Sequence, residues 1–76
     1  MIETLIKLDT FNDVKEFVEM TSKCSGDIYV CSDKHIVDGR SIMGLISLDF
    51  SQVLKVEFHG DIPIDVRDNM QKYIVE

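Results

Sequence analysis

Apolar residues occur with two different spacings along this chain, and each spacing predicts its own secondary structure. In four segments apolar and polar positions alternate, as in a strand that buries one face of a sheet. The clearest is 53–59, where Leu54, Val56 and Phe58 alternate with polar residues. The predicted strands are 2–8, 27–31, 35–38 and 53–59. The short polar stretch between the second and third strands predicts a hairpin.

The spacing i, i+3, i+4, i+7 predicts an amphipathic helix after the first strand. Its apolar face consists of Val14, Phe17, Val18 and Thr21. Thr10 and Asp13 have the positions of a capping box, in which each side chain accepts a hydrogen bond from the other residue's backbone N–H. We expect this helix to end near Lys23, before Ser25 and Gly26.

Two further helices are predicted in the second half of the chain. Ser41 is a suitable N-cap for a short helix over 42–48, which Gly44 weakens by roughly 1 kcal/mol relative to alanine. Pro63 suits the first turn of the last helix, where its missing N–H is not needed. The apolar stripe of that helix is Ile62, Val66, Met70, Tyr73 and Ile74.

The resulting order is βαββαβα, which favours an α+β sandwich with an antiparallel or mixed sheet and helices on one face. Lys55, Glu57 and His59 would then face water on the opposite side of the sheet. With 76 residues and no linker or repeat, we expect a single domain over 1–76.

Charge and composition narrow the classes of function. The chain carries 8 basic and 14 acidic residues, a net charge of −6, which argues against binding nucleic acid or an anionic membrane. No apolar run reaches the ~18 residues of a membrane span, and no signal peptide is recognisable. Two cysteines are too few for a disulfide framework. We therefore expect a cytoplasmic protein.

One segment resembles a known family. The run beginning Arg40-Ser41-Ile42-Met43 and continuing to Leu48 is similar to the regulatory-serine segment of HPr, the phosphocarrier protein of the bacterial sugar phosphotransferase system. The similarity extends over most of the chain. It implies the HPr fold, an open-faced β-sandwich with a four-stranded, mainly antiparallel sheet and three helices on one face.

The same resemblance implies two roles for this segment. Ser41 corresponds to the serine that a kinase phosphorylates in the family, although it is also explained as a helix N-cap. Arg40, Ile42, Met43 and Ile46 correspond to a docking patch for partner proteins. Burial of these apolar residues in the core is the competing interpretation.

The catalytic motif of the family is not present. HPr carries its phosphorylated histidine at the start of the first helix, followed by an arginine and a proline. Thr10 stands at the histidine position, Asn12 at the arginine and Asp13 at the proline. A threonine hydroxyl is a far poorer nucleophile than an imidazole, and Asp9 and Asp13 would repel a phosphoryl group. We therefore expect no catalytic residue and no histidine-phosphate relay.

The resemblance thus implies a non-enzymatic regulatory or docking module, similar to the catabolite-repression paralogue of HPr that lacks the histidine. Its partners would be phosphotransferase-system enzymes, an HPr kinase or a transcription regulator. Two alternatives stay open: a phosphocarrier in sugar uptake with a non-standard acceptor, and a structural domain that has lost both activities. We expect no cofactor, and either a monomer or a strand-swapped dimer.

Neither the histidines nor the cysteines indicate a further site. Cys24, Cys31 and His35 have a spacing that is unusual for zinc, so we predict no metal. His35 and His59 are each interpreted as solvated strand residues. Thr10 itself is most simply a helix cap.

Overall fold

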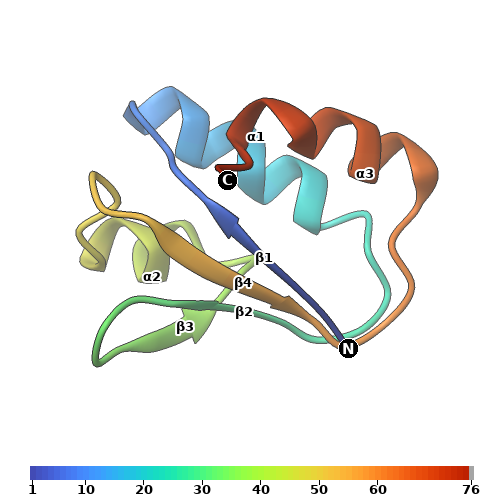
Figure 1. Ribbon diagram of the computed structural model, residues 1–76, viewed down its shortest axis with the longest axis horizontal. Helices are drawn as coiled ribbons and strands as arrows, with labels where there is room; N and C mark the ends of the chain where they lie inside the picture. Colours follow the sequence, from blue (N-terminus) through green and yellow to red (C-terminus); the bar gives the residue numbers. More distant parts are fainter. Residues whose placement is uncertain (76) are drawn as a thin grey trace.

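The computed structural model describes residues 1–75. Four strands and three α-helices follow one another in the predicted order, and a short 3₁₀-helix, η1, follows the last helix (Figure 1). The elements are β1 (Ile2–Ile6), α1 (Phe11–Thr21), β2 (Ile28–Cys31), β3 (Ile36–Asp38), α2 (Ile42–Ser47), β4 (Leu54–Phe58), α3 (Ile64–Met70) and η1 (Gln71–Tyr73).

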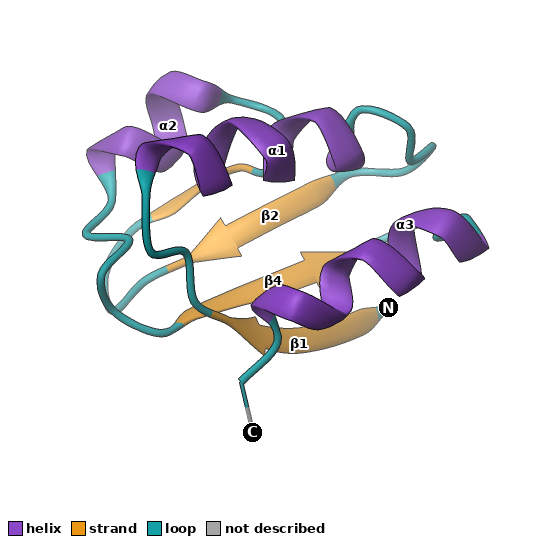
Figure 2. Ribbon diagram, turned by 90° about the horizontal axis from the view of Figure 1, so that it is seen from above, coloured by secondary structure: helices purple, strands orange, loops and turns teal. Residues whose placement is uncertain are grey.

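The strands form one antiparallel sheet in the order β1-β4-β2-β3. β4 pairs with β1 on one side and with β2 on the other, so Val56 lies between Thr4 and Val30. The helices form a second layer against this sheet (Figures 1 and 2). The sequence-based prediction of an α+β sandwich with an antiparallel sheet and three helices is confirmed.

The core lies between the two layers. The alternate strand residues Ile6, Val30, Val56 and Phe58 are buried against Phe17 of α1. The remaining core residues come from β2, β4, all three helices, η1 and the loops: Leu8, Val14, Met20, Cys24, Ile28, Leu45, Leu48, Leu54, Val66, Met70 and Tyr73. On the other face of the sheet Lys55 and His59 are exposed and Glu57 is half-buried.

The first helix differs in two details from the expectation. It ends at Thr21, two residues before Lys23, with Ser22 as its C-cap residue, whose Oγ donates to the carbonyl oxygens of Val18 and Glu19. Its buried face includes Met20, whereas Val18 is only half-buried. The expected capping box is present.

The last helix is shorter than its apolar stripe. Pro63 is the N-cap residue of α3 and not part of its first turn, and α3 gives way to η1 after Met70. Ile74 leaves the helix and forms an isolated antiparallel bridge to Ile6 of β1. The chain end therefore continues the sheet beyond β1, which a helical stripe does not predict.

Two glycines allow the ends of β2 and β4 to approach closely. A Cβ atom on Gly60 would lie 2.6 Å from the Cα of Gly26. This separation leaves no room for a side chain at either residue.

Within residues 1–75 no helix is long and apolar enough to cross a membrane.

Candidate functional site

The residues that the sequence singles out lie at one end of the sandwich. Both the N-terminus of α1 and the whole of α2 are found there (Figures 1 and 2). Leu8 and Leu45, which belong to the same core, anchor the β1–α1 loop and α2.

The N-terminus of α1 is closed by its own side chains. Thr10 Oγ1 accepts a hydrogen bond from the backbone N–H of Asp13 at 3.1 Å. Asp13 Oδ2 accepts from the backbone N–H of Asp9 at 3.0 Å and of Thr10 at 3.3 Å. Backbone N–H groups at a helix start are the usual ligands of a bound anion. Here the threonine hydroxyl occupies one of them, that of Asp13, and the Asp13 carboxylate accepts from the two N–H groups just before the helix.

Asn12 is also engaged within the chain. Its side-chain amide donates to Glu16 Oε1 at 3.0 Å. Glu16 Oε2 in turn accepts from Lys72 Nζ at 2.7 Å and from the Tyr73 hydroxyl at 3.0 Å. The hydrogen bonds from Lys72 and Tyr73 hold the pKa of Glu16 below its usual value. Asn12 thus belongs to a network that ties α1 to the chain end.

The short helix α2 presents apolar side chains to solvent. Ile42 is 38% exposed, Met43 81% and Ile46 45%, whereas Leu45 is fully buried. The competing interpretation, in which all of these residues belong to the core, is therefore wrong. Ser41 caps the helix, and its Oγ accepts from the backbone N–H of Gly44 at 3.0 Å. Ser41 is half-buried and directly precedes the exposed apolar residues in sequence.

Arg40 points away from that surface and into the chain. Its Nε donates to the carbonyl oxygen of Thr21 at 3.2 Å. Its Nη2 donates to the carbonyl oxygen of Cys24 at 2.8 Å, and also to that of Gly26. No basic residue lies in the last turn of α1 itself. Arg40 therefore supplies the positive charge that favours a helix C-terminus from the loop before α2.

Comparison with solved structures gives a clear relative. The crystal structure of HPr-C-His from Thermoanaerobacter tengcongensis superimposes with a TM-score of 0.77 at 30% sequence identity. The alignment covers 95% of this chain and 89% of that chain. The chain belongs to the HPr family. Scans against protein-family models and against curated proteins found no match.

Both histidines of this HPr-family chain lie outside α1 and its N-terminal cap. His35 is exposed in the loop before β3. His59 follows β4, where its Nε2 lies 3.3 Å from Glu57 Oε1 and its ring packs edge-on against Tyr29. The hydrogen bond between His59 and Glu57 is the main reason why the pKa of Glu57 is lowered.

The cysteines are not brought together with the histidines. Cys24 is buried in the core, and burial raises the pKa of its thiol. Cys31 lies on the outer face of the sheet with its Sγ 3.8 Å from Glu57 Oε2, and burial and this carboxylate raise its pKa. Both thiols are therefore protonated at neutral pH and poor nucleophiles. Residues 1–75 contain no cluster of three His, Cys, Asp or Glu side chains suited to a metal ion.

One residue of this end was not singled out from the sequence. Phe11, the first residue of α1, is 51% exposed, and Lys15 Nζ lies 5.9 Å from the centre of its ring. The sequence signal that could have indicated its exposure is its position outside the predicted apolar face of the helix. Phe11 gives the α1 N-terminus an apolar surface beside its closed cap.

Proposed function

We propose that residues 1–76 form one HPr-like docking domain that does not relay phosphate through a histidine. The domain acts by binding partner proteins through Ile42, Met43 and Ile46, and phosphorylation of Ser41 controls this binding. The partners are proteins of the phosphotransferase system, an HPr kinase or a transcription regulator. The members of this family that relay phosphate do so through a histidine at the start of the first helix.

The observation that carries the proposal is the closed cap of α1. Thr10 stands where the family has its phosphorylated histidine, and its hydroxyl already accepts the hydrogen bond of Asp13 N–H. The Asp13 carboxylate occupies the neighbouring N–H groups and adds negative charge. A phosphoryl group at Thr10 would lie beside this carboxylate and would meet its repulsion. Asn12, at the family's arginine position, offers an amide bound to Glu16 in place of a cation.

The start of α2 resembles that of α1 in one respect, since Ser41 Oγ accepts from the backbone N–H of Gly44 as Thr10 Oγ1 accepts from Asp13, but it differs in charge. Its first turn contains no acidic residue, so a phosphate on Ser41 would gain from the helix dipole without a carboxylate on the same turn. The three exposed apolar side chains follow Ser41 directly along the chain. Phosphate on Ser41 would therefore change the charge at the edge of the proposed docking surface.

The first test is phosphorylation by an HPr kinase, measured by intact mass. We expect one added phosphate on the wild type and none on Ser41→Ala. Ser47→Ala is the matched control, because Ser47 lies on the same helix and is exposed. If the wild type gains no phosphate while circular dichroism shows it folded, Ser41 is only a helix cap and the regulatory part of the proposal is wrong.

The second test addresses the relay. After incubation with enzyme I and labelled phosphoenolpyruvate, we expect no acid-labile phosphate on the chain. Acid-labile label on His35 or His59 would refute the proposal in favour of a phosphocarrier with an unusual acceptor.

The docking surface is tested separately by Met43→Asp. Partner proteins are first identified by their binding to the wild-type chain, with and without phosphate on Ser41. Met43→Asp should abolish that binding. Ile64→Asp introduces the same charge at an equally exposed apolar residue of α3 and should leave binding unchanged. Equal effects of the two variants would place the docking surface elsewhere.

A further inference from the structure

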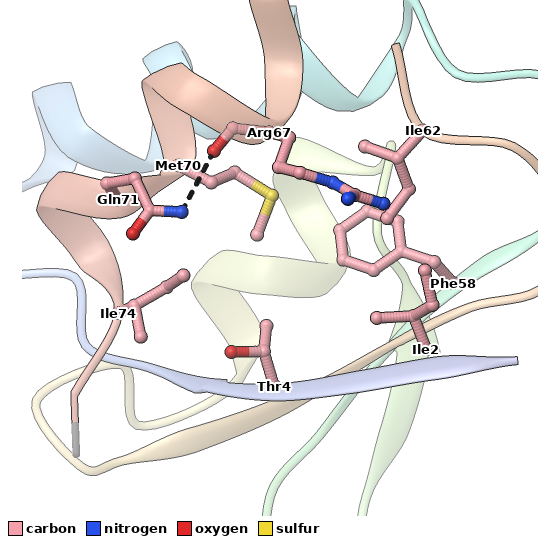
Figure 3. A pocket seen from close by; sticks show the side chains of 8 residues that line it. All are labelled: Ile2, Thr4, Phe58, Ile62, Arg67, Met70, Gln71 and Ile74. Carbon is pink, nitrogen blue, oxygen red and sulfur yellow. Dashed lines mark hydrogen bonds between the residues drawn. The ribbon is translucent and has the colours of Figure 1, made fainter. Parts of the chain in front are cut away.

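A pocket of about 240 Å³ opens between β1 and α3 (Figure 3). It is separate from the Ser41 segment, and no residue of α1 or α2 lines it. Its apolar lining comes from Ile2, Phe58, Ile62, Met70 and Ile74. Three polar side chains complete it, those of Thr4, Arg67 and Gln71.

The pocket exists because one inward-facing residue of β1 is small and polar. Thr4 lies on the inner face of the strand between Ile2 and Ile6. Opposite it, α3 ends at Met70 and the chain turns through η1 towards its bridge with β1. The space that a larger side chain at position 4 would fill is left open between strand and helix.

Arg67 provides a cation beside this apolar lining. Figure 3 shows its side chain extending along the pocket towards Ile62, with Met70 between it and Gln71. Among residues 1–75 its guanidinium has no hydrogen bond and no ion pair, in contrast to that of Arg40. An unpaired guanidinium in a chain of net charge −6 is available for a carboxylate, which it binds through two parallel N–H donors.

We propose that this pocket binds a small amphipathic carboxylate, with its carboxylate on Arg67 and its hydrocarbon part against Phe58 and Met70. The pocket volume corresponds to about eight water molecules at ~30 Å³ each. A ligand of about eight to ten non-hydrogen atoms therefore fills it. Thr4 and Gln71 add polar groups to the same lining, although Gln71 Nε2 already donates to the carbonyl oxygen of Arg67 at 3.3 Å. These groups distinguish the pocket from a purely apolar gap.

Hexanoate is a suitable probe, because it combines one carboxylate with a short alkyl chain, and hexanol is its uncharged counterpart. In titrations followed by ¹⁵N–¹H spectra of the full chain, hexanoate should bind saturably with a Kd on the order of 1 mM, as expected for so small a ligand. The largest shifts should occur in β1 and in the segment from Arg67 to Ile74. Hexanol should bind at least about tenfold more weakly, since it lacks the charge-assisted hydrogen bonds.

Two variants and a control decide between this site and non-specific binding. Arg67→Gln should weaken hexanoate about tenfold and leave hexanol unchanged. Lys23→Gln removes the same charge at an exposed residue outside the pocket and should have no effect. Thr4→Ile should fill the pocket and abolish binding of both probes while the chain stays folded.

The Thr4→Ile variant aside, the proposal is overturned by any of three results. These are hexanoate shifts that do not saturate, hexanol binding as tightly as hexanoate, or equal effects of Arg67→Gln and Lys23→Gln. Retained hexanoate binding in a folded Thr4→Ile variant would likewise place the ligand outside this pocket.

Discussion

Replacement of Arg40 by methionine should destabilise the fold much more than a typical change in a loop. The Arg40 guanidinium donates to the carbonyl oxygens of Thr21, Cys24 and Gly26. These carbonyls end α1 and begin the connection to β2. Methionine keeps most of the aliphatic stem, so the change removes mainly the donors and the charge.

The expected cost follows from the number of hydrogen bonds. A net contribution of ~1 kcal/mol for each of three hydrogen bonds gives an upper estimate of about 3 kcal/mol. Water can reach part of this half-buried site and solvate the freed carbonyls, which lowers the estimate to about 2 kcal/mol. For a chain of this size a loss of that order lowers the Tm by about 8–16 °C.

Urea denaturation followed by far-UV circular dichroism measures this loss directly. Arg67→Met is the matched control, because Arg67 is the only other arginine and is exposed. It should cost less than about 0.5 kcal/mol. If Arg40→Met costs no more than Arg67→Met, the hydrogen bonds of Arg40 do not stabilise the fold, and Arg40 regains its place as a candidate docking residue.

Three further variants test other parts of the structure. Gly60→Ala should cost about 1–3 kcal/mol in urea denaturation, because its Cβ would clash with Gly26, and an unchanged midpoint would contradict that close approach. Thr21→Val should cost about 1–2 kcal/mol in the same assay, because the buried Thr21 hydroxyl donates to the carbonyl oxygen of Gly39 at 2.8 Å; no loss would show that water replaces this bond. For Glu16→Gln the prediction concerns pH. The folded state lowers the pKa of Glu16. The ionised Glu16 carboxylate therefore stabilises the fold at pH values above its unfolded pKa of about 4.3. This stabilisation is lost as the pH falls through the lower folded value. The gap between the denaturation midpoints of wild type and Glu16→Gln should therefore be largest near neutral pH and shrink towards pH 3; a gap independent of pH would refute the ionic role of Glu16.

Local patterns in the sequence predicted most of the fold. The alternation of Leu54, Val56 and Phe58 identified the central strand, because β4 is covered on only one face. Thr10 and Asp13 identified the start of α1, since a capping box involves residues only three apart. The end of α3 was not predictable in this way. Ile74 fits a helical stripe as well as a bridge to β1, and only the tertiary structure decides between them.

The candidate site was predictable only in part, for the same reason. That Ser41 caps a helix follows from its neighbours, and this prediction is confirmed. The hydrogen bonds of the Arg40 guanidinium join residues 14 to 19 positions apart, and those of Glu16 with Lys72 and Tyr73 join residues 56 and 57 positions apart. No pattern within a single element reveals such pairs. The assignment of Ser41 as a phosphorylation site stays a prediction.

The position of Arg40 also bears on how Ser41 would act as a switch. A phosphate on Ser41 would lie next in sequence to a guanidinium whose Nε and Nη2 already donate to backbone carbonyls. Its recruitment to the phosphate would leave the end of α1 without its cation and without three hydrogen bonds. The fold therefore favours a state in which Arg40 stays in place and the phosphate remains available to solvent. In the proposed function, a positive charge that recognises phosphorylated Ser41 comes from the partner protein, while Met43 and its apolar neighbours supply the contact area.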